Sequence, residues 1–321
     1  MVCYYLRTKT VSSQNDIILM DKSAFNKYEI LHKNPLCPAL TKEEWKIYKE
    51  LTTPEVFVLP DERPRLSWKD MALITFTSKN HMPESLENCA SIQQHPQLKT
   101  LPLTVFFSSD VTDNQTVIFE VACPQANIII FPFQTFSLNV QTMMDHYRFK
   151  AIYQVLALKK HKIILSFDSS VLINKNANFT GFIESNIKSN PTDVTLLTSA
   201  NHNMFTTVHP KMYPCFPNIK SETMINVPQF QSGLILWIGT EMGWKAMRRF
   251  VECSLQPSCI APPGATKLCN YNHIYKRPKL FSGCHRYDQS AINLILYETS
   301  NQKPQLYGKK SPLFRVSRKR V

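Results

Sequence analysis

The 321-residue sequence contains few glycines, and this scarcity excludes two common kinds of nucleotide-binding site. There are only 7 Gly against 21 Pro, and neither a GxGxxG nor a GxxxxGK[ST] pattern occurs. A Rossmann dinucleotide site and a P-loop both need such glycines, because their backbone must approach the phosphates closely. Long hydrophobic runs are also missing, since runs such as Leu234 to Ile238 are far shorter than the ~20 residues that span a bilayer. With 43% hydrophobic and 11% aromatic residues the chain can still bury a core, so we expect a globular α/β protein.

A readable targeting signal is also lacking. The first twenty residues carry Arg7, Lys9 and Asp16 and have no continuous apolar core, so they do not resemble a signal peptide. No membrane anchor is visible in the chain either. If the protein is secreted, we therefore expect a truncated gene start. A cytoplasmic protein with free thiols is the alternative.

The nine cysteines include no CxxC pair, which disfavours a zinc ribbon. Four of them fall in one C-terminal window: Cys253, Cys259, Cys269 and Cys284. These four are compatible with disulfides, with buried free thiols or with a metal site, and disulfides are favoured. A Cys253–Cys259 bridge would close a short loop and imply an oxidising compartment. The sequons at Asn114 and Asn178 agree, so we expect the secretory pathway, with the Golgi lumen as the site of residence.

The charge balance is strongly basic. Lys and Arg outnumber Asp and Glu by 37 to 24, which leaves a net charge of +13 and favours polyanionic partners. The excess is densest in residues 301–321, which we interpret as a solvated basic tail rather than a binding arm. Basic residues do not interleave with aromatic ones as in a nucleic-acid-binding module, so no nucleic acid partner is expected.

Three regions are predicted along the chain. Residues 1–66 form an irregular lead-in or stem, in which a capping box at Thr41 and Glu44 predicts a helix over 41–51. Residues 67–300 form the main domain, where short apolar runs alternate with amphipathic segments. The predicted strands are 71–77, 103–107, 126–131 and 163–167, and the predicted helices are 83–92, 112–121 and 147–161. This alternation predicts a mostly parallel sheet with helices on both faces, which binds ligands at the carboxyl ends of its strands.

Polar residues follow the predicted strands at that edge. Asp168 and Ser170 come directly after the strand 163–167, where a carboxylate can bind a divalent cation or simply begin a turn. Gly233 precedes another apolar strand and a helix from Glu241, and it either lets a ligand approach the backbone or marks a bulge.

A second polar group stands ahead of the apolar run 291–296. Asp288 and Gln289 suit the orientation of sugar hydroxyls, and His285 and Arg286 could meet a phosphate. The competing interpretation is that Asp288 only caps the helix that follows.

The order of these motifs resembles that of GT-A glycosyltransferases. More narrowly, residues 68–300 resemble the nematode-rich DUF1647 family of glycosyltransferase-like proteins. The motifs that carry the resemblance are Thr77–His81, Tyr147–Lys150, Asp168–Ser170, Gln231–Gly233, the loop Cys253–Cys259 with Ile260–Pro263, and Cys284–Ser290.

The resemblance implies a GT-A-like fold and transfer of a sugar from a nucleotide-sugar donor to a hydroxyl of a glycan or glycoprotein, with an anionic acceptor compatible with the basic charge. It implies that Asp168 binds Mn²⁺ or another divalent cation. The implied donor-binding residues are Thr77, Lys150, Ser170, Gly233 and Arg286, and the implied catalytic residues are Asp288, Gln289 and His285. Arg148, beside Tyr147, is expected on a helix surface. The alternative is a catalytically inactive member of the fold that binds carbohydrate or serves a structural role.

Overall fold

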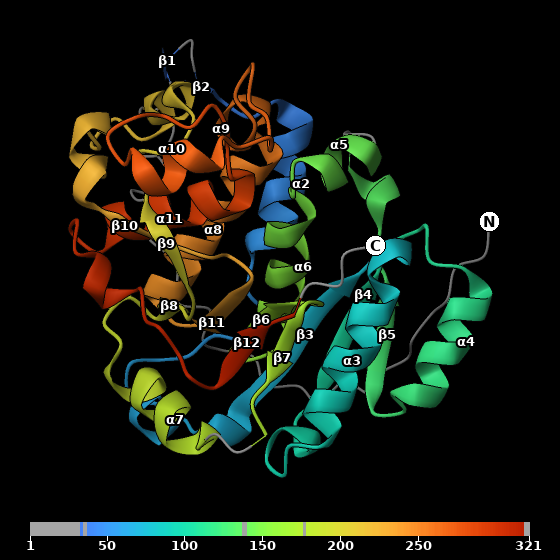
Figure 1. The fold of residues 1–321 in the computed structure, drawn as a ribbon. Helices are drawn as coiled ribbons and strands as arrows, with labels where there is room; N and C mark the ends of the chain where they lie inside the picture. The colour runs from blue at the N-terminus through green and yellow to red at the C-terminus, as the bar shows by residue number, and fades with distance from the viewer. Residues whose placement is uncertain (1–32, 35–36, 137–139, 176–177, 318–321) are drawn as a thin grey trace.

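The computed structural model describes residues 33–34, 37–136, 140–175 and 178–317 (Figure 1). Most of the predicted lead-in therefore lies outside the described residues, as do the last four residues of the predicted tail.

A six-stranded sheet forms the centre of this part of the chain. Its order is β5 (Ala126–Ile130), β4 (Leu103–Phe107), β3 (Met71–Thr77), β6 (Ile163–Asp168), β11 (Leu234–Ile238) and β8 (Val194–Leu196). The strands from β5 to β6 are parallel, whereas β11 runs antiparallel to both of its neighbours. The predicted architecture, a mostly parallel central sheet flanked by helices behind an irregular N-terminal region, is confirmed.

Helices cover both faces of the sheet (Figure 1). One face carries α2 (Lys42–Thr52), α6 (Phe149–Leu158), α8 (Glu241–Leu255) and α11 (Tyr287–Thr299). The other carries α3 (Met82–Gln93), α4 (Asp113–Ala122) and α7 (Phe179–Ser189). The shorter helices are α5 (Val140–Asp145), α9 (Pro257–Ile260) and α10 (Tyr271–Lys276). Short 3₁₀ segments occur at Arg63–Arg65, Trp68–Asp70, Lys79–His81, Leu98–Thr100, Phe133–Thr135, Pro210–Cys215, Ser221–Asn226 and Pro304–Leu306.

Three small two-stranded sheets complete the described elements. They pair β1 (Lys33–Asn34) with β2 (Cys37–Pro38), β9 (Ser199–Asn203) with β10 (Pro228–Phe230), and β7 (Val171–Ile173) with β12 (Phe314–Val316). The last pair attaches part of the predicted tail to the domain, where Tyr307 is also fully buried.

The period of two along each strand divides the core between the two faces. In β3, Ile74 and Phe76 belong to the core cluster that includes residues of α6 and α8, whereas Leu73 belongs to the cluster that includes residues of α3 and α7. Every residue of β3 is buried, which explains why its sequence is a continuous apolar run rather than an alternating one.

Arg148 differs from its predicted place. The helix predicted over 147–161 begins only at Phe149, after a left-handed φ of 54° at Tyr147. Arg148 is 1% exposed, and its guanidinium donates hydrogen bonds to the carbonyls of Ser254 (2.6 Å) and Pro257 (3.1 Å). The expectation of a helix-surface role is therefore wrong, because the buried carbonyl of Ser254, in the last turn of α8, needs a hydrogen-bond donor.

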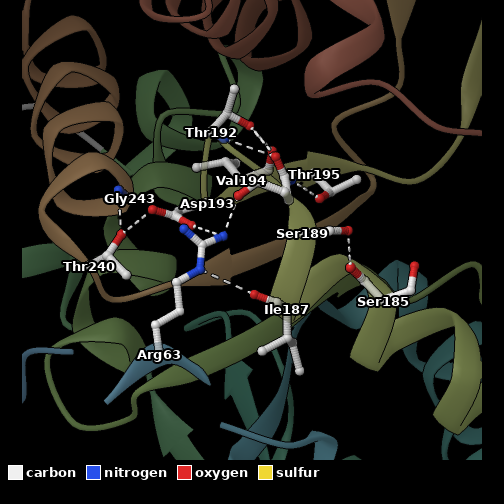
Figure 2. Close-up of polar contacts among 11 residues, drawn as sticks. Arg63, Ser185, Ile187, Ser189, Thr192, Asp193, Val194, Thr195, Thr240 and Gly243 are labelled. Carbon is white, nitrogen blue, oxygen red and sulfur yellow. Dashed lines mark hydrogen bonds and ion pairs between the residues drawn. The ribbon is translucent and has the colours of Figure 1, made fainter. Parts of the chain in front are cut away.

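An ion pair fixes the segment that leads into the domain (Figure 2). Arg63 pairs with the buried Asp193 at 2.6 Å, and its guanidinium also donates to the carbonyls of Ile187 and Asn190. Asp193 in turn accepts a 2.5 Å bond from Thr240, whose hydroxyl caps α8. One buried carboxylate thus connects the lead-in, the loop before β8 and the start of α8.

Eight cysteines form four disulfides, Cys37–Cys215, Cys89–Cys123, Cys253–Cys259 and Cys269–Cys284. The predicted short loop at Cys253–Cys259 is confirmed. Within the described ranges, no helix is both long and apolar enough to cross a membrane.

Candidate active site

Four elements bring polar side chains together at the carboxyl edge of the parallel strands. Asp168 ends β6, and Gly233 precedes β11 directly opposite it, with the Asp168 N–H donating to the Gly233 carbonyl at 2.8 Å. Lys150 lies in the first turn of α6, and Asp288 lies in the first turn of α11. The sheet and the two helices on one of its faces therefore position a single cluster.

Lys150 connects the two carboxylates of this cluster. Its Nζ lies 2.7 Å from Asp168 Oδ1 and 3.3 Å from Asp288 Oδ2, with only 8% of the side chain exposed. Burial alone would lower the pKa of Lys150, but the charges of Asp168 and Asp288 outweigh burial and raise it. The ammonium therefore stays protonated at neutral pH.

Asp288 is held from two sides. Its carboxylate accepts a 2.5 Å hydrogen bond from Ser232 Oγ and pairs with Lys150. Burial raises the pKa of Asp288, and these two contacts oppose the rise. Asp288 does not cap α11, whose N-cap position is Arg286 with no side-chain cap bond, so the interpretation as a simple cap does not describe this residue.

Gly233 leaves the space that the Asp168 carboxylate fills. A Cβ built on Gly233 would lie 2.6 Å from Asp168 Oδ2, closer than real contacts allow. No other residue type fits there without displacing the carboxylate.

A pocket of about 120 Å³ opens beside the cluster. It is lined by Tyr147, Lys150, Asp168, Gln231, Ser232, Gly233, Lys267, His285, Arg286, Tyr287, Asp288 and Gln289. Three of these residues are cationic, Lys150, Lys267 and Arg286, against two carboxylates. Arg286 Nε is buried and has no hydrogen-bond partner among the described residues, so this donor is available to a ligand. A net positive lining with an unused donor suits an anionic group.

The structure brings Asp168, Lys150, Gly233, Asp288, Gln289 and Arg286 together, as well as His285. His285 is fully buried, and both ring nitrogens serve the backbone: Nδ1 accepts from the His209 N–H, and Nε2 donates to the Ile260 carbonyl. Burial lowers the pKa of His285 to about 3, so the ring is neutral and holds two loops together.

Two predicted donor-binding residues lie outside the pocket lining. Thr77 ends β3, where its buried hydroxyl hydrogen-bonds Ser85. Ser170 lies in the turn between β6 and β7, and its carbonyl accepts from Ser317 N at 2.7 Å. Both contacts are internal to the fold.

Sequence reasoning assigned no role to five residues of the pocket, which are Tyr147, Gln231, Ser232, Lys267 and Tyr287. Ser232 was available as a signal, because it stands inside the Gln231–Gly233 motif. Tyr147 packs its ring 5.4 Å from Lys150 Nζ, a contact that depends on the left-handed turn before α6. Lys267 comes from the loop after α9, and no local pattern indicates its approach to the site.

The arrangement does not fit a divalent cation held between the two carboxylates, because the Lys150 ammonium lies between them. In the part of the chain that the structure describes, no three His, Cys, Asp or Glu side chains gather where they could hold a metal. At this position the geometry favours an ion pair over a coordinated ion.

No family model matches the chain, and no curated protein sequence does. The resemblance to DUF1647 therefore stays a prediction.

The chain is similar to several solved glycosyltransferase structures, each at 12% identity. The bifunctional glycosyltransferase WbbM in its apo form overlaps with a TM-score of 0.46 over 81% of this chain and 40% of that one, so this chain spans less than half of its length. Mouse xyloside xylosyltransferase 1 in its apo form gives a TM-score of 0.43 over 75% and 84% of the two chains. The mannosyltransferase Ktr4p from S. cerevisiae in complex with GDP gives 0.43 over 86% and 82%.

Proposed function

We propose that the protein is a glycosyltransferase of the GT-A type, which transfers a sugar from a nucleotide-sugar donor to a hydroxyl of a glycan or glycoprotein. One observation carries this proposal. The Lys150–Asp168–Asp288 cluster and the unpartnered donor of Arg286 share one pocket at the carboxyl edge of the sheet, where open α/β sheets bind ligands.

The reaction breaks the bond between the anomeric carbon and the diphosphate oxygen, and it forms a bond from that carbon to the acceptor oxygen. The acceptor hydroxyl loses its proton, and a nucleoside diphosphate leaves with an added negative charge. Arg286 and Lys267 supply positive charge where that charge develops, which is the kind of preorganised stabilisation that accelerates such reactions.

The carboxylates have distinct tasks in this proposal. Asp168 is the more accessible, with 35% of its side chain exposed, so it meets the sugar hydroxyls together with the amide of Gln289. Lys150 and Asp288 are positioning residues that hold the Asp168 carboxylate in place. A pocket of about 120 Å³ is smaller than the roughly 300–1,000 Å³ of whole-ligand sites, so it holds only part of the donor.

We also place this activity in the lumen of the secretory pathway. Four disulfides persist in oxidising compartments and are rare in the cytosol. The Golgi is the compartment within that pathway that suits a nucleotide-sugar-dependent transferase.

The test is binding and turnover of a panel of nucleoside diphosphates and nucleotide sugars by the purified chain. We expect one nucleotide to raise the melting temperature, because a ligand that binds only the native state stabilises it. Release of free nucleoside diphosphate then measures transfer. Each assay is run with Mn²⁺ and with EDTA, and we expect the thermal shift to be the same in both.

Arg286→Gln should weaken nucleotide binding about tenfold or more, since charge-assisted bonds to phosphate contribute roughly 1.5–3 kcal/mol. Arg315→Gln is the matched control, because Arg315 is exposed on β12, outside the pocket lining. Binding without turnover would support the inactive, carbohydrate-binding alternative. The absence of any nucleotide shift on folded protein would overturn the proposal.

A further inference from the structure

A long segment beside the site carries positive charge and no negative charge. Between Glu252 and Asp288 the sequence contains no Asp or Glu but five Lys and Arg residues. We call residues 267–284 of this segment the basic loop. Its cations Lys276, Arg277 and Lys279 are exposed, and none of them pairs with an acidic residue in the described part of the chain. Such unneutralised charge indicates an anionic partner.

The same loop presents aromatic rings to solvent. Tyr271 and Tyr275 are 60% and 59% exposed, and no other aromatic side chain whose burial the structure describes is exposed. An exposed Tyr offers an apolar ring face and a polar hydroxyl, which suits a partner with both characters. Sugar rings have apolar C–H faces and hydroxyl edges, so rings and cations together fit a charged glycan.

The basic loop is preorganised rather than free. The Cys269–Cys284 disulfide closes it, and the Asn203 side chain donates a 2.8 Å bond to the Pro278 carbonyl. The Ser282 N–H donates to Thr206 at 2.9 Å. Figure 1 shows α10, which lies within the loop, in the same half of the molecule as β9. A surface that is ordered before binding loses little conformational entropy on contact.

The loop is continuous with the candidate active site through a neighbouring hollow. This hollow, of about 330 Å³, is lined by Ser199, Asn201, His202, Asn203 and Asn226, among others. The His202 ring lies 6.5 Å from the Tyr275 ring, and the Ser199 carbonyl accepts a bond from Gln231, which lines the pocket of the active site. A chain lying on the basic loop would thus reach the pocket across the hollow.

We propose that the basic loop and the adjoining hollow bind the acceptor, and that the acceptor is an anionic polysaccharide bearing carboxylate or sulfate groups. This inference rests on the proposed glycosyl transfer and names its acceptor class. A nucleic acid would satisfy the cations, but the loop is closed by a disulfide, which indicates an oxidising compartment where extracellular glycans rather than nucleic acids are assembled.

The test measures binding of a heparin-derived dodecasaccharide to the full chain at 0.15 M salt. The triple variant Lys276→Gln/Arg277→Gln/Lys279→Gln should bind about tenfold more weakly or worse, because three charge contacts are lost. The matched control is Lys99→Gln/Lys220→Gln/Lys245→Gln, which removes the same charge from exposed positions elsewhere. It should change the affinity less than threefold.

A second pair of variants tests the rings. Tyr275→Ala should weaken binding several-fold, whereas Tyr275→Phe keeps the ring face and should bind nearly as well as the wild type. Equal losses in the two triple variants would overturn the proposal, because binding would then follow net charge alone. Equal binding of a neutral oligosaccharide, or equal competition by single-stranded DNA of the same charge, would overturn it too.

Failure of this inference can be told apart from failure of the proposed function. The loop contributes only Lys267 to the pocket lining, and Lys276, Arg277 and Lys279 do not line it, so the loop triple variant should keep the nucleotide thermal shift. A retained nucleotide shift without any oligosaccharide binding rejects the acceptor surface alone. Loop-dependent oligosaccharide binding without any nucleotide shift supports the surface and rejects the transferase.

Discussion

Removal of the cation between the two carboxylates should destabilise the fold, and Lys150→Met is the sharpest such change. The variant keeps the volume of the stem but leaves Asp288 buried, 7% exposed and without its counter-ion. Breaking a buried ion pair by removing one partner costs about 3–5 kcal/mol, because an uncompensated charge remains. At roughly 2–4 °C per kcal/mol, the melting temperature should fall by about 10 °C.

The double variant Lys150→Met/Asp288→Asn supplies the decisive comparison. A neutral amide needs no counter-ion and can still accept from Ser232, so the double variant should recover most of the lost stability. Asp168, which is 35% exposed, can be solvated and needs no such rescue. Chemical denaturation of the four members of the cycle measures the coupling.

The loss of stability in Lys150→Met should also depend on pH. Without Lys150 the pKa of Asp288 rises further above its unfolded value, so the folded variant takes up a proton more readily than the unfolded chain. The contribution of Asp288 to the stability of the variant is then most favourable below the unfolded pKa of about 3.9, and it is lost as pH rises through the folded pKa. The difference in the free energy of unfolding between Lys150→Met and the wild type should therefore become smaller as the pH falls. A loss under about 1 kcal/mol, or no recovery in the double variant, would refute the reasoning.

Three further predictions follow from single contacts. Gly233→Ala should slow sugar transfer by about tenfold or more with little loss of stability, since its Cβ would displace the Asp168 carboxylate; release of free nucleoside diphosphate checks this. Arg63→Met should lower the free energy of unfolding by about 3 kcal/mol in urea denaturation, because it leaves Asp193 buried and unpaired (Figure 2). The pKa of His285 is lowered to about 3, so the unfolded chain takes up a proton on this ring before the folded chain does, and the protein should lose stability as pH falls from about 6.5 towards 3. His285→Gln should make the free energy of unfolding less dependent on pH in this range.

The sequence was sufficient to predict the sheet where local signals were strong. The strands over 71–77 and 103–107 and the capping box at Thr41 lie as predicted, because buried parallel strands are continuous apolar runs and caps are local. The direction of β11 could not be predicted. A run of apolar residues does not indicate in which direction the strand runs. The antiparallel pairing of β11 with β6 depends on the path of the long connection that includes β9 and β10.

The sequence could predict which residues form the site, but it could not predict which of their side chains contact one another. Asp168, Gly233 and Asp288 were identified by their positions after or before apolar runs, and they do meet. What sequence could not show is that Lys150 joins both carboxylates, since this contact closes only when α6 and α11 pack on the same face. Arg148 illustrates the same limit, because its partners are backbone carbonyls more than 100 residues away.

Asp168 and Asp288 share one lysine but differ in access, and this difference decides what each can do. A group that moves a proton must come within hydrogen-bonding reach of the hydroxyl it serves. Only 7% of the Asp288 side chain is exposed, and Ser232 and Lys150 both contact its Oδ2 from within the fold. Asp168 leaves one oxygen, Oδ2, outside the ion pair, and a third of its side chain is exposed. We therefore infer that Asp168 contacts the reacting sugar and that Asp288 acts through Lys150, so Asp168→Asn should abolish transfer in a stable protein, whereas Asp288→Asn should first be detected as a change in stability.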